Sequence, residues 1–128
     1  IYQSGAVYFT YEHDGLNRRI SLNYTAAPGG GSLTTDFYHS NQWQVIEVRN
    51  SDAESVALKQ FLWGSRYVDE LIRRWHDSDQ DGTMNDHHYA MADANFSIVA
   101  IADQGGDVAE RYSYTPYGDR TVLEAADF

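Results

Sequence analysis

The residues best suited to chemistry in this sequence lie in one acidic stretch, DSDQDGTMNDHH, at positions 77–88. Carboxylates at alternate positions followed by glycine can converge on one hard cation such as Ca²⁺, because glycine allows the sharp bend that gathers them. A backbone carbonyl and a side-chain amide of the same stretch would supply further oxygens. The expected calcium ligands are Asp77, Asp79, Asp81, Thr83, Asn85 and Asp86.

The acidic stretch departs from the calcium loop of helix-loop-helix proteins at its last position. That loop ends in a bidentate Glu, whereas this sequence has His88. We therefore expect a looser calcium site, completed by Asp86 or by a backbone carbonyl. The alternative is a solvated acidic hairpin tip without a metal. In either case the stretch would order a loop and would not catalyse a reaction.

Other residue patterns that carry chemistry are weak or missing. His76, His87 and His88 suggest zinc, but their spacing matches no standard tetrahedral set. The sequence contains no nucleophile elbow, phosphate-binding loop or dinucleotide fingerprint. We therefore expect that this chain is not an enzyme.

The formal net charge of −10 limits the partners of this chain. A surface this acidic repels phosphate backbones and anionic lipid headgroups, so we expect no nucleic-acid partner. No apolar run reaches the roughly 20 residues that a membrane-spanning helix needs. Aromatic residues make up 14% of the chain, and this content favours β-strands.

Alternating apolar and polar residues predict a hairpin at the start of the chain. Strands are expected at 6–11 and 19–24, on either side of a turn at Asp14 and Gly15, so that residues 1–25 form a first hairpin. The glycine-rich segment that follows has little to bury. We expect residues 26–35 to be a flexible connection.

The segment 52–77 is open to two interpretations. Its apolar residues recur near helical spacing, but Gly64 interrupts the pattern, and glycine costs about 1 kcal/mol inside a helix. We therefore expect two strands here, at 59–63 and 66–75.

An internal repeat is visible in the second part of the chain. The segment WQVIEV at 43–48 aligns with FSIVAI at 96–101, and each is followed by a polar turn and another aromatic strand. Self-similarity of this kind is typical of stacked units that cannot bury their apolar faces alone. We expect residues 36–128 to form two related hairpin units, at about 36–88 and 89–128.

A strand–turn–strand pattern stands out at 110–120, ERYSYTPYGDR. Tyr112 and Tyr114 fall on one face of a strand, and Pro116 and Gly118 end that strand in a turn. A second copy of the pattern, YEHDGLNRR, begins at Tyr11.

These two stretches resemble the YD repeat of Rhs proteins, teneurins and the insecticidal toxin-complex shells. In the comparison Tyr11 matches Tyr112, Asn17 stands where Gly118 stands, and His13 replaces a tyrosine. The residues that carry the motif at the two turns are Gly15, Asn17, Arg18, Pro116, Gly118 and Arg120.

The resemblance implies an all-β fold in which successive antiparallel hairpins form a curved or spiral sheet, as part of a shell, barrel or fibre. Residues 1–128 would be one YD-repeat region of a bacterial protein that is secreted or displayed at the cell surface. Its partners would be neighbouring YD repeats, of the same or identical chains, joined through sheet edges, and an enclosed toxin domain. Such a chain would be a non-catalytic wall segment that serves encapsulation, display or self-assembly into fibres.

The aromatic side chains that recur with the repeat have two interpretations. They could form the packed inner side of the sheet, and on this interpretation the core aromatics are Tyr11, Trp43, Trp63, Phe96, Tyr112 and Tyr114. Alternatively, they could stack on sugars in a small calcium-dependent extracellular module that binds a glycan or a surface protein. This second function predicts exposed tryptophans.

Overall fold

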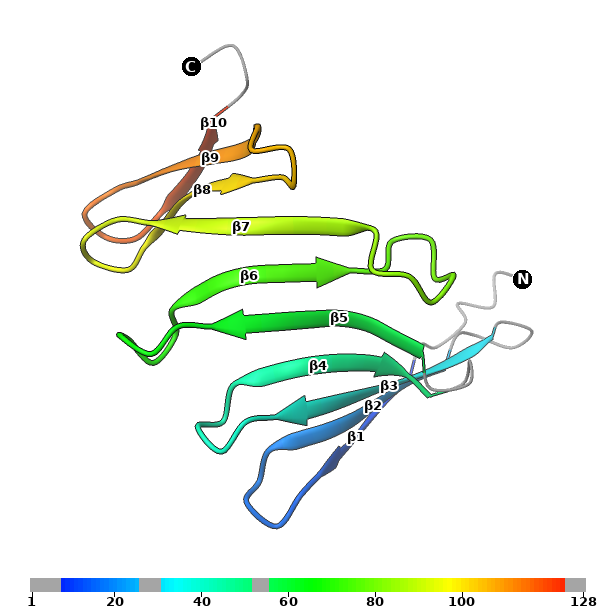
Figure 1. Ribbon diagram of the computed structural model, residues 1–128. Helices are drawn as coiled ribbons and strands as arrows, with labels where there is room; N and C mark the ends of the chain where they lie inside the picture. The colour runs from blue at the N-terminus through cyan, green and yellow to red at the C-terminus, as the bar shows by residue number, and fades with distance from the viewer. Residues whose placement is uncertain (1–7, 26–30, 52–55, 124–128) are drawn as a thin grey trace, which may run out of the picture.

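The computed structural model describes residues 8–25, 31–51 and 56–123, which form one ten-stranded antiparallel sheet (Figure 1). Each inner strand is hydrogen-bonded to the strands that precede and follow it in sequence, which confirms an all-β fold of successive hairpins. Within these ranges no helix is long and apolar enough to cross a membrane. The strands are β1 (Tyr8–His13), β2 (Arg19–Thr25), β3 (Ser32–His39), β4 (Val45–Asn50), β5 (Val56–Trp63), β6 (Leu71–His76), β7 (Asp86–Ala92), β8 (Ile98–Ala102), β9 (Val108–Tyr114) and β10 (Arg120–Leu123).

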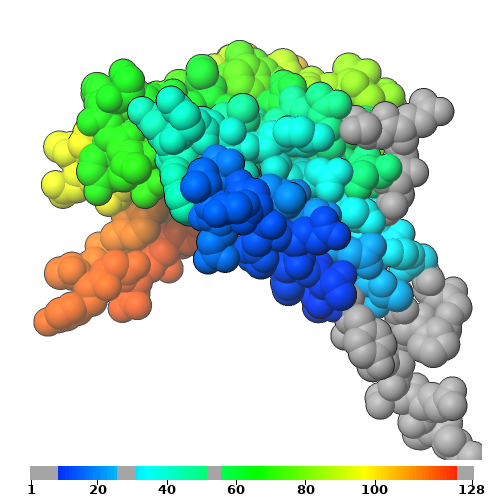
Figure 2. Space-filling view, turned by 90° about the horizontal axis from the view of Figure 1, so that it is seen from below, coloured from blue at the N-terminus to red at the C-terminus, as the bar shows by residue number. Residues whose placement is uncertain are grey.

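Within the described residues the sheet is open, because β1 and β10 each pair with a neighbour on one side only. It also curves. Seen from below, the N-terminal strands and the C-terminal hairpin stand on either side of a hollow beneath the middle strands (Figure 2). Two edges of unpaired backbone groups therefore remain in the described part of the chain.

The strand register divides the side chains between two faces. Directly paired residues share a face, so Phe37, its partner Val48 and the partner of Val48, Lys59, lie in one row. We call this side the aromatic face. Its aromatic and aliphatic side chains are Phe9, Tyr11, Leu22, Tyr24, Leu33, Phe37, Val48, Phe61, Ile101, Tyr112, Tyr114 and Val122.

The other side, which we call the opposite face, is polar in the N-terminal strands. Glu12 pairs with Ser21, and Ser21 with Asp36, in a row that continues to Arg49. Strands β1 to β4 are therefore amphipathic, with the alternation that is usual when one face of a sheet is covered.

The described residues contain little apolar core. Val48, Ala100 and Ala102 are the apolar residues that are buried there. The expectation of a packed inner side is wrong for Tyr11, Trp43 and Tyr114, which are 50%, 57% and 40% exposed. The cause is the single layer, since no second sheet or helix among the described residues covers either face. The other expected core aromatics are partly buried: Trp63, Phe96 and Tyr112.

Two expected boundaries need correction. The connection expected at 26–35 ends earlier, because β3 begins at Ser32 and pairs with β2; residues 26–30 lie outside the described ranges. The strand expected at 66–75 starts only at Leu71. The Gly64 amide donates to the Glu70 carbonyl at 2.7 Å, which closes residues 64–70 into a turn. The sequence left a choice between helix and strand at 59–63. The expected strand is confirmed as part of β5.

One type of hairpin turn recurs at 14–18, 40–44, 93–97, 103–107 and 115–119. In each, the amide of the first residue donates to the carbonyl of the fifth, and the amide of the fourth donates to the carbonyl of the first. The fourth residue has positive φ in every case, as at Asn17 (63°) and Gly118 (88°). The expected equivalence of Asn17 and Gly118 is therefore confirmed.

Candidate functional site

The acidic loop between β6 and β7 is organised by Asp77. This side chain is 1% exposed, and its carboxylate accepts hydrogen bonds from the amides of Asp81 (3.2 Å) and Gly82 (2.8 Å). The Asp77 amide donates to the Leu58 carbonyl at 2.9 Å and so ties the loop to β5. Positive φ at Gly82 (92°) allows the bend that glycine was expected to supply.

The electrostatics of Asp77 favour the charged form. Burial by itself would raise the pKa of this carboxyl, but hydrogen bonds from the amides of Gly82, Gln80 and Asp81 outweigh it and lower the pKa. Asp77 therefore enters the loop as a carboxylate at neutral pH.

The loop brings together the aspartates that the sequence singled out. Carboxylate oxygens of Asp77, Asp79 and Asp81 all lie within 4.8 Å of one another, and the last two side chains are exposed. Such a set of oxygens could hold a metal ion. Among the described residues, these three aspartates are the group of three or more His, Asp or Glu side chains close enough together to bind one metal ion.

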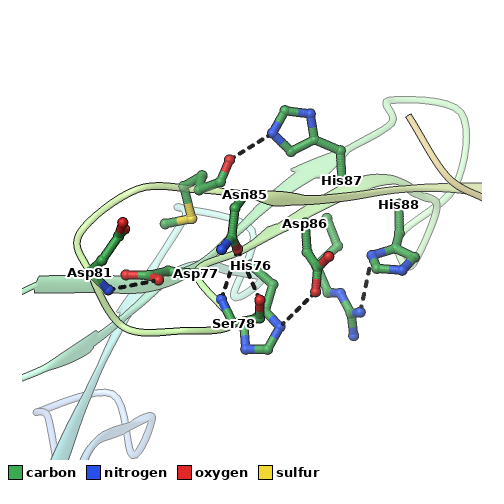
Figure 3. A network of polar contacts seen from close by, with 10 residues as sticks. His76, Asp77, Ser78, Asp81, Asn85, Asp86, His87 and His88 are labelled. Atoms are coloured by element: carbon green, nitrogen blue, oxygen red, sulfur yellow. Dashed lines mark hydrogen bonds and ion pairs between the residues drawn. The ribbon is translucent and has the colours of Figure 1, made fainter. Parts of the chain in front are cut away.

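Two of the remaining expected ligands, Asn85 and Asp86, have partners outside this group (Figure 3). The Asn85 side-chain oxygen accepts from the Ser78 amide at 3.0 Å and from the Ser78 hydroxyl at 3.1 Å. The carboxylate of Asp86 lies 3.7 Å from His76 Nδ1, on the strand side of the loop. The amide of Thr83 donates to the Asp81 carboxylate at 2.7 Å.

The histidines beside the loop do not converge on a metal position. Figure 3 shows His87 on one side of β7 and His88 on the other. His87 Nδ1 accepts from Arg73 at 2.8 Å, and its Nε2 donates to the Met84 carbonyl at 2.9 Å, so both ring nitrogens have partners. Burial, with Lys59 and Arg74 nearby, lowers the pKa of His76.

A second group of contacts lies at the ends of the strands opposite the acidic loop, where the chain turns after β1, β3, β5, β7 and β9 (Figure 1). The Arg18 guanidinium donates to the Ser40 carbonyl at 3.3 Å and lies 5.8 Å from the ring centre of Trp43. The same side chain donates to its own turn, from Nε to Asp14 at 2.6 Å. Arg18, a residue of the YD-like motif, thus joins the first of these turns to the second.

Further contacts join successive turns on this side of the sheet. Gln44 donates from its amide side chain to the Val68 carbonyl at 2.6 Å, and Tyr67 stacks on Phe96 with ring centres 4.6 Å apart. Tyr114 donates through its hydroxyl to the Ile98 carbonyl at 2.6 Å. We call this chain of contacts the turn seam.

The turn after β5 differs from its neighbours and is held by a buried carboxylate. Glu70 is 4% exposed, accepts from the Arg66 amide at 3.1 Å and forms an ion pair with the Arg66 guanidinium. Hydrogen bonding from the Arg66 side chain outweighs burial and lowers the pKa of Glu70. A Cβ at Gly64 would lie 2.0 Å from the Glu70 carboxylate, so only glycine leaves room for this arrangement.

The turn seam was not predicted from the sequence, although the residue type at the first position of its recurring turns could have indicated where those turns lie. The first residue of each recurring turn is Asp, Ser or Thr, and its side-chain oxygen accepts a hydrogen bond from the amide of the fifth residue. The other motif residues have local roles. Arg120 lies 5.1 Å from the ring centre of Tyr112, and no side chain comes near the Cβ position of Gly15.

Comparison with known proteins gives a partial match only. No family model matches the chain. The tRNA3(Ser)-specific nuclease WapA of Bacillus spizizenii is 25% identical over 118 residues, a stretch that covers 92% of this chain and 4% of that protein. The chain therefore corresponds to a small segment of this much longer relative.

Proposed function

We propose that this chain is a non-catalytic wall segment of a YD-repeat, Rhs-like bacterial protein that is secreted or displayed at the cell surface. Its backbone would form part of a β-sheet wall that encloses or displays another polypeptide, or that assembles into fibres. The observation that supports this function best is the sheet topology. Strands in strict sequence order leave β1 and β10 free to continue the sheet in both directions.

The alignment with the long relative supports a role as one segment among many. A stretch that covers 92% of this chain fits within 4% of a protein that is named a tRNA-specific nuclease. By this analogy an enclosed or attached toxin domain is a partner of the wall, and the nuclease chemistry would reside elsewhere in the protein. The described residues offer backbone edges and turn contacts for such a role.

The test of this function is the assembly state of the purified chain, measured by sedimentation velocity and electron microscopy. Val122→Lys places a charge on the edge strand β10, whereas Val108→Lys changes a comparably exposed valine on the inner strand β9 (49% and 40% exposed). Charged side chains on an edge strand oppose pairing with another edge. We expect association of the original chain and of Val108→Lys, and loss of association in Val122→Lys. A monomer at all concentrations would contradict assembly through the edges.

We further propose that calcium binds the acidic loop and orders it. Asp79 and Asp81 are exposed and close to the charged Asp77, so a divalent cation would relieve their mutual repulsion. A ligand that binds the folded chain alone raises its stability by mass action, by about 2.7 kcal/mol at a hundredfold excess over Kd. We expect calcium to raise the melting temperature of the chain and of Asp107→Asn, but not that of Asp79→Asn. An unchanged melting temperature in the original chain would contradict calcium binding.

The calcium-dependent glycan module is the weaker alternative. Trp43 is 57% exposed, as that function predicts. However, successive turns of an antiparallel meander alternate between the two ends of the strands. The turn 40–44 and the acidic loop therefore lie at opposite ends of the strands (Figure 1). Calcium in the loop would therefore not organise Trp43.

A further inference from the structure

The charged side chains are distributed unequally over the sheet. The aromatic face carries the cations Arg19, Lys59, Arg74 and Arg120, placed there by the register or by ring contacts. Among the described residues, the carboxylates on the same face are Asp86 and Glu110. This face is therefore net positive, in a chain whose formal charge is −10.

The acidic residues are concentrated instead at the turns that flank the faces. Within the described ranges these turn residues are Asp14, Asp69, Glu70, Asp77, Asp79, Asp81, Asp93, Asp103, Asp107 and Asp119. The opposite face is nearly balanced, with carboxylates from Glu12, Asp36 and Glu47 and cations from Arg49, Arg73 and Arg111. The net-positive aromatic face therefore lies between two rows of acidic turns, one at each end of the strands.

The cations of the aromatic face lie beside apolar groups and lack carboxylate partners. The Arg19 guanidinium is 4.5 Å from the ring centre of Phe37, and Lys59 is two residues from Phe61 on the same strand face. The ion pairs found among the described residues involve none of these four cations. The same face exposes large apolar side chains, among them Phe9 (53%) and Tyr11 (50%).

We propose that the aromatic face is a docking surface for an extended polypeptide segment that carries both carboxylate and apolar side chains. Apolar groups of the segment would cover the exposed rings and aliphatic chains, and its carboxylates would pair with the neighbouring cations. Side chains of an extended segment that face the sheet are every second residue, so a suitable partner carries acidic and apolar side chains in turn at every second position. Docking on this face does not involve the edge strands β1 and β10. Its test is therefore independent of the test of assembly through these strands.

Charge also decides between this partner and two others. In a face-to-face dimer two net-positive faces would meet, and such like-charge contact opposes association. An anionic bilayer would be drawn to the cations but repelled by the acidic turns at both ends of the strands. A narrow acidic segment can lie between the turns without approaching them closely.

The experiment measures the binding of fluorescein-labelled synthetic peptides to the full chain by fluorescence anisotropy. We expect a peptide of repeating Asp-Ser-Phe-Ser, called the Asp–Phe peptide, to bind, because one side of the extended chain then carries both Asp and Phe. Its affinity should fall as salt is added, since screening weakens pairs between exposed charges. The matching peptide of repeating Lys-Ser-Phe-Ser, called the Lys–Phe peptide, should bind at least about tenfold more weakly. A peptide with the same Asp positions but Ser in place of Phe should also bind weakly, because it has nothing to cover the rings.

Two charge reversals locate the surface. Lys59→Glu on the aromatic face should weaken the Asp–Phe peptide about five- to tenfold, whereas Arg111→Glu on the opposite face makes the same charge change and should leave the affinity within about twofold. Circular dichroism verifies that both variants are folded, and Arg120→Glu replaces Lys59→Glu if the latter unfolds.

Several results would overturn docking of such a segment. These are no binding of the Asp–Phe peptide, equal binding of the Lys–Phe peptide, and equal losses in Lys59→Glu and Arg111→Glu. Binding of phosphatidylserine vesicles that depends on Lys59 would identify a membrane as the partner instead. Self-association that Lys59→Glu abolishes would identify a second copy of the chain.

Discussion

Tyr67 and Phe96 stack with their ring centres 4.6 Å apart and their planes 11° from parallel. The first residue lies in the turn after β5 and the second in the turn after β7, so the pair joins two hairpins at one end of the strands. Phe96 holds its ring there with a φ of 64°, a conformation that is uncommon for an aromatic residue. In a single-layer sheet, such contacts between turns take over part of the role of a core.

The stack should contribute measurably to stability. Aromatic pairs of this geometry are worth about 0.5–1.5 kcal/mol beyond the area that they bury. We expect a double-mutant cycle of Tyr67→Ala and Phe96→Asn, followed by urea unfolding, to give a coupling free energy of about 1 kcal/mol. Asn is chosen at 96 because it tolerates positive φ, and a coupling within error of zero would show that the rings are neighbours without mutual stabilisation.

The turn at Gly118 should be sensitive to a side chain. Its φ of 88° is unfavourable for any residue with a Cβ, although no atom would obstruct one. We expect Gly118→Ala to lower the free energy of unfolding by about 1 kcal/mol or more. The matched control is Gly15→Ala, also unobstructed but without positive φ, which should be neutral or slightly stabilising. Equal losses in the two variants would rule out backbone strain as the cause.

The recurring turns also show how far the sequence could predict the fold. Asn17 and Gly118 were recognised as equivalent because both residue types are common at positive φ. Trp43 and Phe96 were recognised as equivalent to each other but interpreted as core positions, since aromatic residues ordinarily indicate strands. The structure places both in the turn, with φ of 69° and 64°. Local propensity could not show this, because the turn is held by side-chain oxygens of Ser40 and Asp93.

The acidic loop was predicted in part for a similar reason. Alternating aspartates before a glycine correctly indicated that Asp77, Asp79 and Asp81 would lie together. The involvement of Asp86 was a prediction that the geometry does not support. That residue begins β7 and pairs across the sheet with His76, and cross-strand register depends on the whole hairpin rather than on the spacing within the loop.

Stability should fall in acid through Glu70. The pKa of its carboxyl is lowered in the folded chain from an ordinary value of 4.5. Below that value the unfolded chain binds a proton more readily than the folded one, so stability present above about pH 4.5 is lost as the pH falls through the folded pKa. We expect melting temperatures between pH 6 and pH 3 to fall less steeply in Glu70→Gln than in the original chain. Parallel curves would show that the Arg66–Glu70 pair does not contribute to acid sensitivity.

The last prediction concerns Trp43, where two opposing effects meet. Its φ of 69° costs an aromatic residue about 1 kcal/mol relative to a residue suited to this conformation. The contact of its ring with Arg18, at 5.8 Å, offsets about 0.5–1 kcal/mol of that cost. Trp43→Asn should therefore be nearly neutral in the original chain, because strain and contact are lost together.

In an Arg18→Ala background the contact is already absent, so the same substitution removes strain alone. There we expect Trp43→Asn to be stabilising by roughly 1 kcal/mol in urea unfolding. The matched control is Trp43→Val, which should be destabilising in both backgrounds because a β-branched side chain is poorly accommodated at positive φ. An identical effect of Trp43→Asn with and without Arg18 would show that the first two turns of the seam are not coupled through this pair.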